Sequence, residues 1–253
     1  MARPRVAVFK FSSCAGCQLQ ILNIEDQLLA VVGAVDFAYF VMAKRENVPG
    51  PYDLGFVEGA ITSTEEVKKI KQVRGQVRKL VALGSCACFG GLPSLKNSRT
   101  QREVEAEVYE HPGAICSIPA AGIDRYVPVD GLLRGCPIDT DELLELVKAE
   151  LLGITPSLRT HSVCMECKLQ ENPCLFQTRG EVCLGPVTSA GCGARCPSNG
   201  RACHGCRGPS DDPNARSLAQ AMWEAGLTRE EIYRRFQLYA GDTQAFQEGG
   251  RLP

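Results

Sequence analysis

The chain has 253 residues, with 28 basic and 29 acidic side chains and a formal net charge of −1 at pH 7. This length suffices for one large domain or two smaller ones with an apolar core. The balanced charge argues against nucleic acid or an anionic membrane as the main partner. No apolar stretch approaches the ~20 residues that cross a bilayer, and the N-terminal segment lacks the pattern of a signal peptide. The sequence therefore predicts a cytoplasmic protein without a membrane span.

The first part of the chain alternates between strand-like and helix-like segments. Short apolar runs predict strands at residues 5–11, 35–42, 54–61, 79–83 and 126–129. Helices are predicted at residues 19–32, from a capping-box pattern at 63–66, and at 139–152. Such alternation is typical of a mostly parallel sheet with helices on both faces. We therefore expect an α/β domain over residues 1–153.

The composition changes after Pro156. Eight cysteines, many glycines and prolines, and few large apolar residues lie between Val163 and Pro209. Because such a stretch cannot bury enough apolar area to fold unaided, something other than an apolar core must hold it together. Two helices are predicted further on, at residues 215–225 and 230–239, the second capped by Thr228. We expect a second, loop-rich domain over residues 154–253 that ends in helices.

Fourteen cysteines are the unusual feature of the composition. In a long chain without an export signal, so many thiols indicate metal binding rather than disulfides. Cys88 and Cys116 are expected to be small buried apolar residues. The other twelve form a first set of Cys14, Cys17, Cys86 and Cys136, a second set of Cys164, Cys167, Cys174 and Cys183, and a third set of Cys192, Cys196, Cys203 and Cys206.

The first set is dispersed in the sequence, but each member follows a predicted strand or lies in a turn before a helix. In an open parallel sheet these loops share one edge, where ligands bind, so we expect the four thiols to converge there. Cys136 also lies just before the helix predicted at Asp139, whose N–H groups favour anionic sulfur. Two other interpretations stay open, namely buried structural cysteines or, for Cys14 and Cys17, a thioredoxin-like redox site.

The second and third sets are compact, with the spacings C-x2-C-x6-C-x8-C and C-x3-C-x6-C-x2-C. Four thiolates in a short loop suit either tetrahedral zinc or a cubane iron–sulfur cluster, and spacing alone does not exclude zinc. Three sites in one chain favour a series of redox clusters. His161, three residues before Cys164, is an alternative ligand in the second set. The chain contains no dinucleotide or P-loop motif, which fits a carrier of electrons better than an enzyme acting on a nucleotide.

Several motifs together resemble the small subunits of nickel–iron hydrogenases. They are SCAGC at 13–17, LGSCACFGG at 83–91, GCP at 135–137, CLGPVT at 183–188, GCGARCP at 191–197 and CHGCRGP at 203–209. Their order and spacing extend over most of the chain. The resemblance is strongest to the shorter cytoplasmic branch, which includes sulfhydrogenase-type and viologen- or coenzyme-reducing enzymes.

The resemblance implies a flavodoxin-like N-terminal domain with a proximal cluster on the first set. It implies a C-terminal iron–sulfur domain with a medial cluster on the third set and a distal cluster on the second, each of the [4Fe–4S] type. Cys196 stands where exported relatives have proline, which implies four irons at the medial site, and Cys167 is favoured over His161 at the distal site. The implied function is electron transfer between the nickel–iron centre of a separate large subunit and a further flavin- or iron–sulfur-containing subunit.

Two alternatives remain open. One is an electron-transfer subunit of another redox complex, such as a respiratory relative, although such relatives usually have adjacent cysteines where this chain has Cys14 and Cys17 separated by two residues. The other is a zinc-stabilised binding module. Metal analysis distinguishes the zinc module, because only the cluster interpretation predicts iron and acid-labile sulfide.

Overall fold

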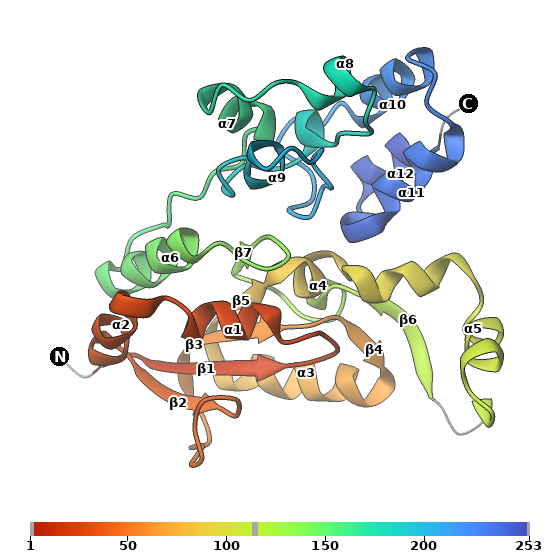
Figure 1. Cartoon of the computed structure of the whole chain (residues 1–253). Coiled ribbons are helices and arrows are strands. Elements are labelled where there is room, and N and C mark those ends of the chain that lie inside the picture. The colour runs from red at the N-terminus through yellow and green to blue at the C-terminus, as the bar shows by residue number, and fades with distance from the viewer. Residues whose placement is uncertain (1–2, 113–115, 252–253) are drawn as a thin grey trace. The chain divides into compact units, whose positions relative to one another are not determined.

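The computed structural model describes residues 3–112 and 116–251. The chain divides into two compact units, Met1–Ile154 and Thr155–Pro253. In the first unit, five strands form one parallel sheet in the order β2-β1-β3-β5-β7 (Figure 1). The strands are β1 (Arg5–Lys10), β2 (Asp36–Phe40), β3 (Tyr52–Glu58), β5 (Val77–Leu83) and β7 (Gly131–Leu133). This order is that of flavodoxin-like folds, so the predicted fold class is confirmed.

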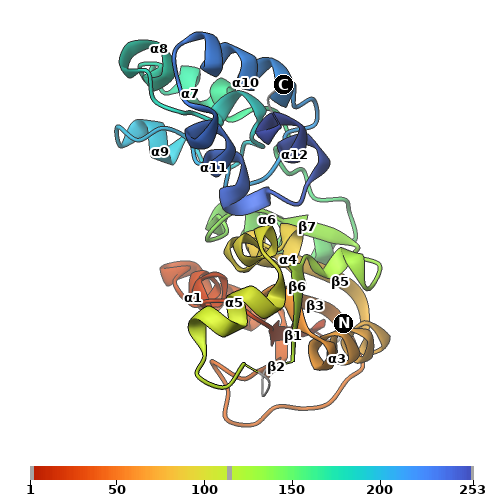
Figure 2. The same cartoon turned by 90° about the vertical axis from the view of Figure 1, so that its right-hand side faces the viewer.

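Helices cover both faces of this sheet, with α1 and α3 on opposite sides (Figure 2). A short antiparallel pair, β4 (Ile61–Ser63) and β6 (Ser117–Ala121), lies beside them. The helical segments are α1 (Gly16–Leu22), η1 (Glu25–Gln27), α2 (Leu28–Ala34), α3 (Thr64–Gln76), α4 (Gly84–Phe89), η2 (Leu92–Ser98), α5 (Gln101–Val108), η4 (Ile123–Arg125) and α6 (Thr140–Leu152).

Local sequence explains where the two longest of these helices begin. The Ser63 hydroxyl accepts the N–H of Glu66 at 3.2 Å at the start of α3, as the capping-box pattern predicts. The Asp139 carboxylate caps α6, and Gly153 ends that helix with φ 67°, the left-handed conformation that glycine adopts without strain. The central strand β3 is buried along almost its whole length, because a parallel strand covered on both faces has no solvent side.

Two predicted elements of the first unit differ from the structure. Residues 126–129 do not form a strand, because Pro128 has no N–H for a sheet ladder. The edge strand is β7, a few residues later, and it leads into Cys136. The single helix predicted at 19–32 is divided into α1, η1 and α2, since Asn23 ends α1 and Glu25 takes a positive φ of 46°.

Helices and loops make up the described part of the second unit. The helical segments are α7 (Val163–Leu169), α8 (Leu175–Arg179), η5 (Gly185–Val187), α9 (Arg195–Ser198), α10 (Ala215–Glu224), α11 (Arg229–Ala240) and α12 (Gln244–Gly250). Helices α10, α11 and α12 pack together (Figure 2) around Phe236 and Phe246, whose rings meet edge to face with centroids 5.4 Å apart. Thr228 caps α11 in a capping box with Glu231, so both predicted C-terminal helices are confirmed.

None of the helices in the described ranges combines the length and the apolar character needed to cross a lipid bilayer.

Candidate metal centres

The first cysteine set lies at the C-terminal edge of the parallel sheet. Cys14 and Cys17 follow β1, Cys86 lies in α4 directly after β5, and Cys136 follows β7. Strand β3 lies between β1 and β5, so its last residue, Glu58, ends at the same edge. Parallel strands present their C-terminal loops together, which brings these segments into one place.

The electrostatics of the thiols show that the four members of the first set are neighbours. Burial, followed by the charges of Cys86, Cys14 and Glu58, raises the pKa of Cys136 to about 11. Burial also raises the pKa of Cys17, and the charges of Glu58, Cys136 and Cys86 raise it further. Four thiols that disfavour one another's ionisation are unstable as free thiolates, and a bound cationic metal centre removes that penalty. Four neighbouring thiols are the donor type that holds the irons of an iron–sulfur cluster.

Gly84 and Gly91 allow the main chain to pass close to the sulfur atoms of Cys17 and Cys86. A Cβ at Gly84 (φ 80°) would lie 2.4 Å from the Cys17 Sγ, and one at Gly91 (φ 55°) would lie 2.7 Å from the Cys86 Sγ. Both distances are far below van der Waals contact, and both φ values are strained for residues with a side chain. The glycines of the motif at 83–91 thus leave space around sulfur that any other residue would fill.

Glu58 fixes the start of α1. Its side chain is only 2% exposed; one oxygen accepts the main-chain N–H of Cys17 at 3.0 Å, and the other accepts from Gln18 Nε2 at 2.6 Å. A buried carboxylate of this kind is stable only when such donors match it. Glu58 was not predicted from the sequence, because a glutamate at the end of a strand gives no signal of its burial.

Asp139 caps α6, the helix whose N–H groups were expected to stabilise an anionic Cys136 sulfur. An oxygen of Asp139 accepts the N–H groups of Asp141 at 3.0 Å and Glu142 at 3.4 Å. Two of the N–H groups expected to face a sulfur anion are therefore bonded to a carboxylate, and the expected favourable effect on Cys136 is reduced.

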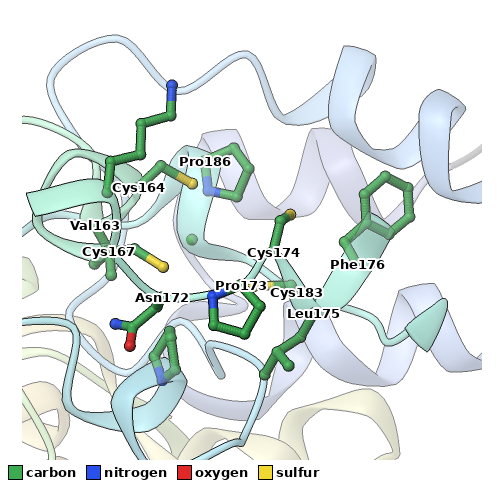
Figure 3. Close-up of a pocket in the computed structure, with 13 residues that line it drawn as sticks. Val163, Cys164, Cys167, Asn172, Pro173, Cys174, Leu175, Phe176, Cys183 and Pro186 are labelled. Atoms are coloured by element: carbon green, nitrogen blue, oxygen red, sulfur yellow. The ribbon is translucent and has the colours of Figure 1, made fainter. Parts of the chain in front are cut away.

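The second cysteine set surrounds one cavity of about 110 Å³ in the second unit (Figure 3). Cys164, Cys167, Cys174 and Cys183 all line it, and the Cys164 and Cys167 sulfurs project into the space beside Cys174 in the close-up. Most of the remaining lining is apolar, from proline, leucine, valine and phenylalanine side chains. Soft sulfur donors in an apolar shell suit an iron–sulfur cluster.

Electrostatics and close packing also bring the members of the second set together. Burial and then the charges of Cys183, Cys167 and Cys174 raise the pKa of Cys164 to about 12. A Cβ at Gly185 would lie 3.3 Å from the Cys164 Sγ and 3.6 Å from the Cys183 Sγ. The members of the second set are therefore neighbours, with Gly185 close to two of their sulfurs.

His161 is not among the described residues that line this cavity, whereas Cys167 is. The main-chain carbonyl of His161 accepts the N–H of Ala190 at 2.7 Å. Of the two candidate fourth donors of the second set, Cys167 is thus the one that lines the cavity.

The third set lies within and on either side of α9. Cys203 is buried, and after burial the charges of Cys183 and Cys206 raise its pKa. Its main-chain N–H donates to the Cys183 Sγ at 3.3 Å, which links the third set to the second. Cys192 lies beside Glu166, and Cys196 lies in α9. Cys192 packs against the small apolar cluster that contains Cys203, so these two members of the third set belong to one packed region.

Other features bear on the predicted chemistry. Within residues 3–112 and 116–251, no three His, Cys, Asp or Glu side chains are grouped closely enough to share one metal ion. None of the 14 cysteines, all of which lie in the described ranges, forms a disulfide. Cys88 is buried as expected, and its thiol lies 3.6 Å from the Ala82 carbonyl. Cys116 is exposed, contrary to the expectation, because it lies just before the edge strand β6 rather than in the core.

Comparison with known proteins identifies the family. Residues 14–149 match the family described as "NADH ubiquinone oxidoreductase, 20 Kd subunit", a span that covers more than half of the chain and all four cysteines of the first set. The chain belongs to this family.

Relatives of the chain within the family are hydrogenase subunits. It is 35% identical to sulfhydrogenase 2 subunit delta of Pyrococcus furiosus, over 93% of this chain and 99% of that subunit. It is 32% identical to a subunit of the F420-non-reducing hydrogenase vhu of Methanocaldococcus jannaschii, over 88% and 90% of the two chains. A solved structure of an NAD+-reducing [NiFe]-hydrogenase in the H2-reduced state is similar with a TM-score of 0.56 and 26% identity, over 62% and 96%. The resemblance inferred from the motifs is confirmed.

Proposed function

We propose that this chain is the electron-transfer subunit of a cytoplasmic nickel–iron hydrogenase. It relays electrons between the nickel–iron centre of a separate large subunit and a further flavin- or iron–sulfur-containing subunit. The observation that carries the proposal is the convergence of the dispersed first set at one sheet edge, in a chain whose relatives are hydrogenase subunits over nearly their whole length.

Each cysteine set has a role in this proposal. The first set holds a proximal cluster, the third a medial cluster and the second a distal cluster, all [4Fe–4S]. Bound clusters of this type supply the acceptance and release of single electrons. The protein holds iron through its thiolates, and Glu58 fixes the main chain at Cys17. Apolar side chains make up most of the lining beside the sulfurs of the second set.

The cytoplasmic location rests on the thiols themselves. The 14 cysteines form no disulfide in the structure, and several lie close together. In an oxidising compartment neighbouring thiols form disulfides, whereas a reducing cytoplasm preserves them for metal binding.

A second candidate is an electron-transfer subunit of a respiratory-type complex, because the family description names a subunit of NADH ubiquinone oxidoreductase. Hydrogenase relatives that align over most of their length favour the first candidate. A nickel-containing subunit that copurifies with this chain decides for the hydrogenase.

A single substitution tests the proposed function. In the complex isolated without oxygen, Cys14→Ser removes one sulfur donor of the first set, and we expect hydrogen-dependent dye reduction to fall at least a hundredfold. The matched control is Cys116→Ser, which removes an exposed thiol outside the three sets and leaves activity at the wild-type level. Near-normal activity in Cys14→Ser contradicts the proximal assignment.

A further inference from the structure

One buried charge of the second unit lies between two of the proposed ligands. Glu166 lies in α7 between Cys164 and Cys167, and it is only 5% exposed. Carboxylates are almost never buried this deeply unless donors or opposite charges match them. The partners of Glu166 therefore show what the side chain does.

Those partners lie on other segments of the unit. One oxygen of Glu166 accepts the N–H of Gly191 at 2.9 Å and a guanidinium N–H of Arg159 at 3.1 Å. The other accepts the N–H of Ala194 at 3.2 Å and lies 4.0 Å from the Cys192 Sγ. One carboxylate thus binds both ends of the turn that contains Cys192, while its own helix holds two thiols of the second set.

Arg207 binds the residues that lead into the same turn. Its Nε donates to the carbonyl oxygens of Ser189 at 3.2 Å and Ala190 at 2.7 Å, and the residue is only 2% exposed. Burial raises the pKa of Cys192, the charge of Glu166 raises it further, and the charge of Arg207 opposes this effect. Two buried charges of opposite sign therefore act on the same thiol.

The donors around Glu166 are those that suit a carboxylate, namely the N–H groups of Gly191 and Ala194 and the guanidinium of Arg159, which forms a salt bridge with it at 3.1 Å. Such partners stabilise the charged form of a buried carboxyl group. A fixed negative charge next to a redox centre disfavours the arrival of an electron. Hydrogen bonds and charges near the sulfurs are among the factors that set the potential of an iron–sulfur cluster.

We propose that Glu166 is a positioning residue that ties the helix of Cys164 and Cys167 to the turn of Cys192, and that its charge lowers the reduction potential of the cluster bound through Cys192. This inference rests on the proposed function, because it requires clusters on the second and third sets. Glu166 then links the two sites structurally, and its charge sets part of the potential of the third-set cluster.

The test compares two substitutions that each remove one negative charge from the second unit. Glu166→Gln removes the buried charge, and Glu224→Gln removes an exposed one from the end of α10. Reductive titrations of the complex, followed by electron paramagnetic resonance, give the potential of each cluster, and Cys206→Ser identifies the signal of the third set. Iron content is measured for every variant.

We expect Glu166→Gln to keep its iron and to shift the third-set potential to a more positive value. A tenfold change in the reduction equilibrium corresponds to about 59 mV for one electron. Glu224→Gln keeps the wild-type potentials. A fully loaded Glu166→Gln with wild-type potentials overturns the proposal.

Arg159→Gln covers the case in which Glu166→Gln fails to assemble. The Arg159 side chain is 64% exposed, so its removal leaves the fold intact but takes away a cation that balances Glu166. The third-set potential then shifts to a more negative value, and an unchanged potential overturns the proposal.

Glu166→Ala tests the positioning role. A shared anchor predicts that the signals of the second and third sets are both lost, so loss of the second-set signal alone contradicts it. If the wild-type complex itself contains no iron, the proposed function is refuted rather than this inference.

Discussion

At the scale of single residues, two buried glutamates organise the thiols. Glu58 binds the main-chain N–H of Cys17, and Glu166 binds the N–H groups on either side of Cys192. Neither residue could be predicted from the sequence, because burial and partners far along the chain are properties of the fold. The cysteines themselves could be predicted, since thiol clusters have few uses in a reducing compartment other than metal binding.

Gly84→Ala tests the close approach of main chain and sulfur in the first set. The new Cβ would lie 2.4 Å from the Cys17 Sγ at a φ of 80°, and the left-handed conformation alone costs about 1–2 kcal/mol. We expect the complex to lose about four irons per chain, as measured by metal analysis, because one cluster is displaced.

The matched control for Gly84→Ala is Gly75→Ala. Gly75 lies in α3 with open space around its Cα, and alanine favours helix there by about 1 kcal/mol relative to glycine. Full iron content in Gly84→Ala would show that the glycine does not shape the first site.

At the scale of elements, periodic and capped segments were predicted well. Strands β1 and β5, helix α3 after Ser63 and helix α6 after Asp139 follow from local patterns. The strand predicted at 126–129 from its apolar residues is absent. Pro128 lacks the N–H that a sheet ladder needs. Helix α5 was missed although Thr100 and Glu103 form a capping box, since α5 buries none of its side chains and so has no clear apolar stripe.

Phe236→Ala tests the packing of the C-terminal helices. Phe236 is fully buried in α11 and packs edge to face on Phe246, so its truncation removes a large apolar contact. We expect the free energy of unfolding of the second unit to fall by about 3–5 kcal/mol, as measured by denaturant titration of the holoprotein.

Tyr233→Ala is the control on the same helix. The Tyr233 side chain is 41% exposed, and its loss is expected to change the free energy of unfolding by about 0.5 kcal/mol. Equal effects of the two substitutions would contradict a core between α10, α11 and α12.

At the scale of the whole molecule, the sheet domain and the cysteine-rich region differ in how they are packed. The first unit has an extended apolar core, whereas the small cluster of Val163, Ala194 and Cys203 in the second unit is packed largely against other cysteines. The composition predicted this contrast. The grouping of the third set could not be predicted beyond its spacing, because its geometry depends on contacts such as that of Cys192 with Glu166.

Metal and sulfide analysis of the complex isolated without oxygen tests the central claim most directly. Three [4Fe–4S] clusters predict about twelve irons and about twelve acid-labile sulfides per chain, with a brown colour and no stoichiometric zinc. A colourless preparation, or one with zinc in place of iron, would contradict the assignment of the twelve cysteines to clusters.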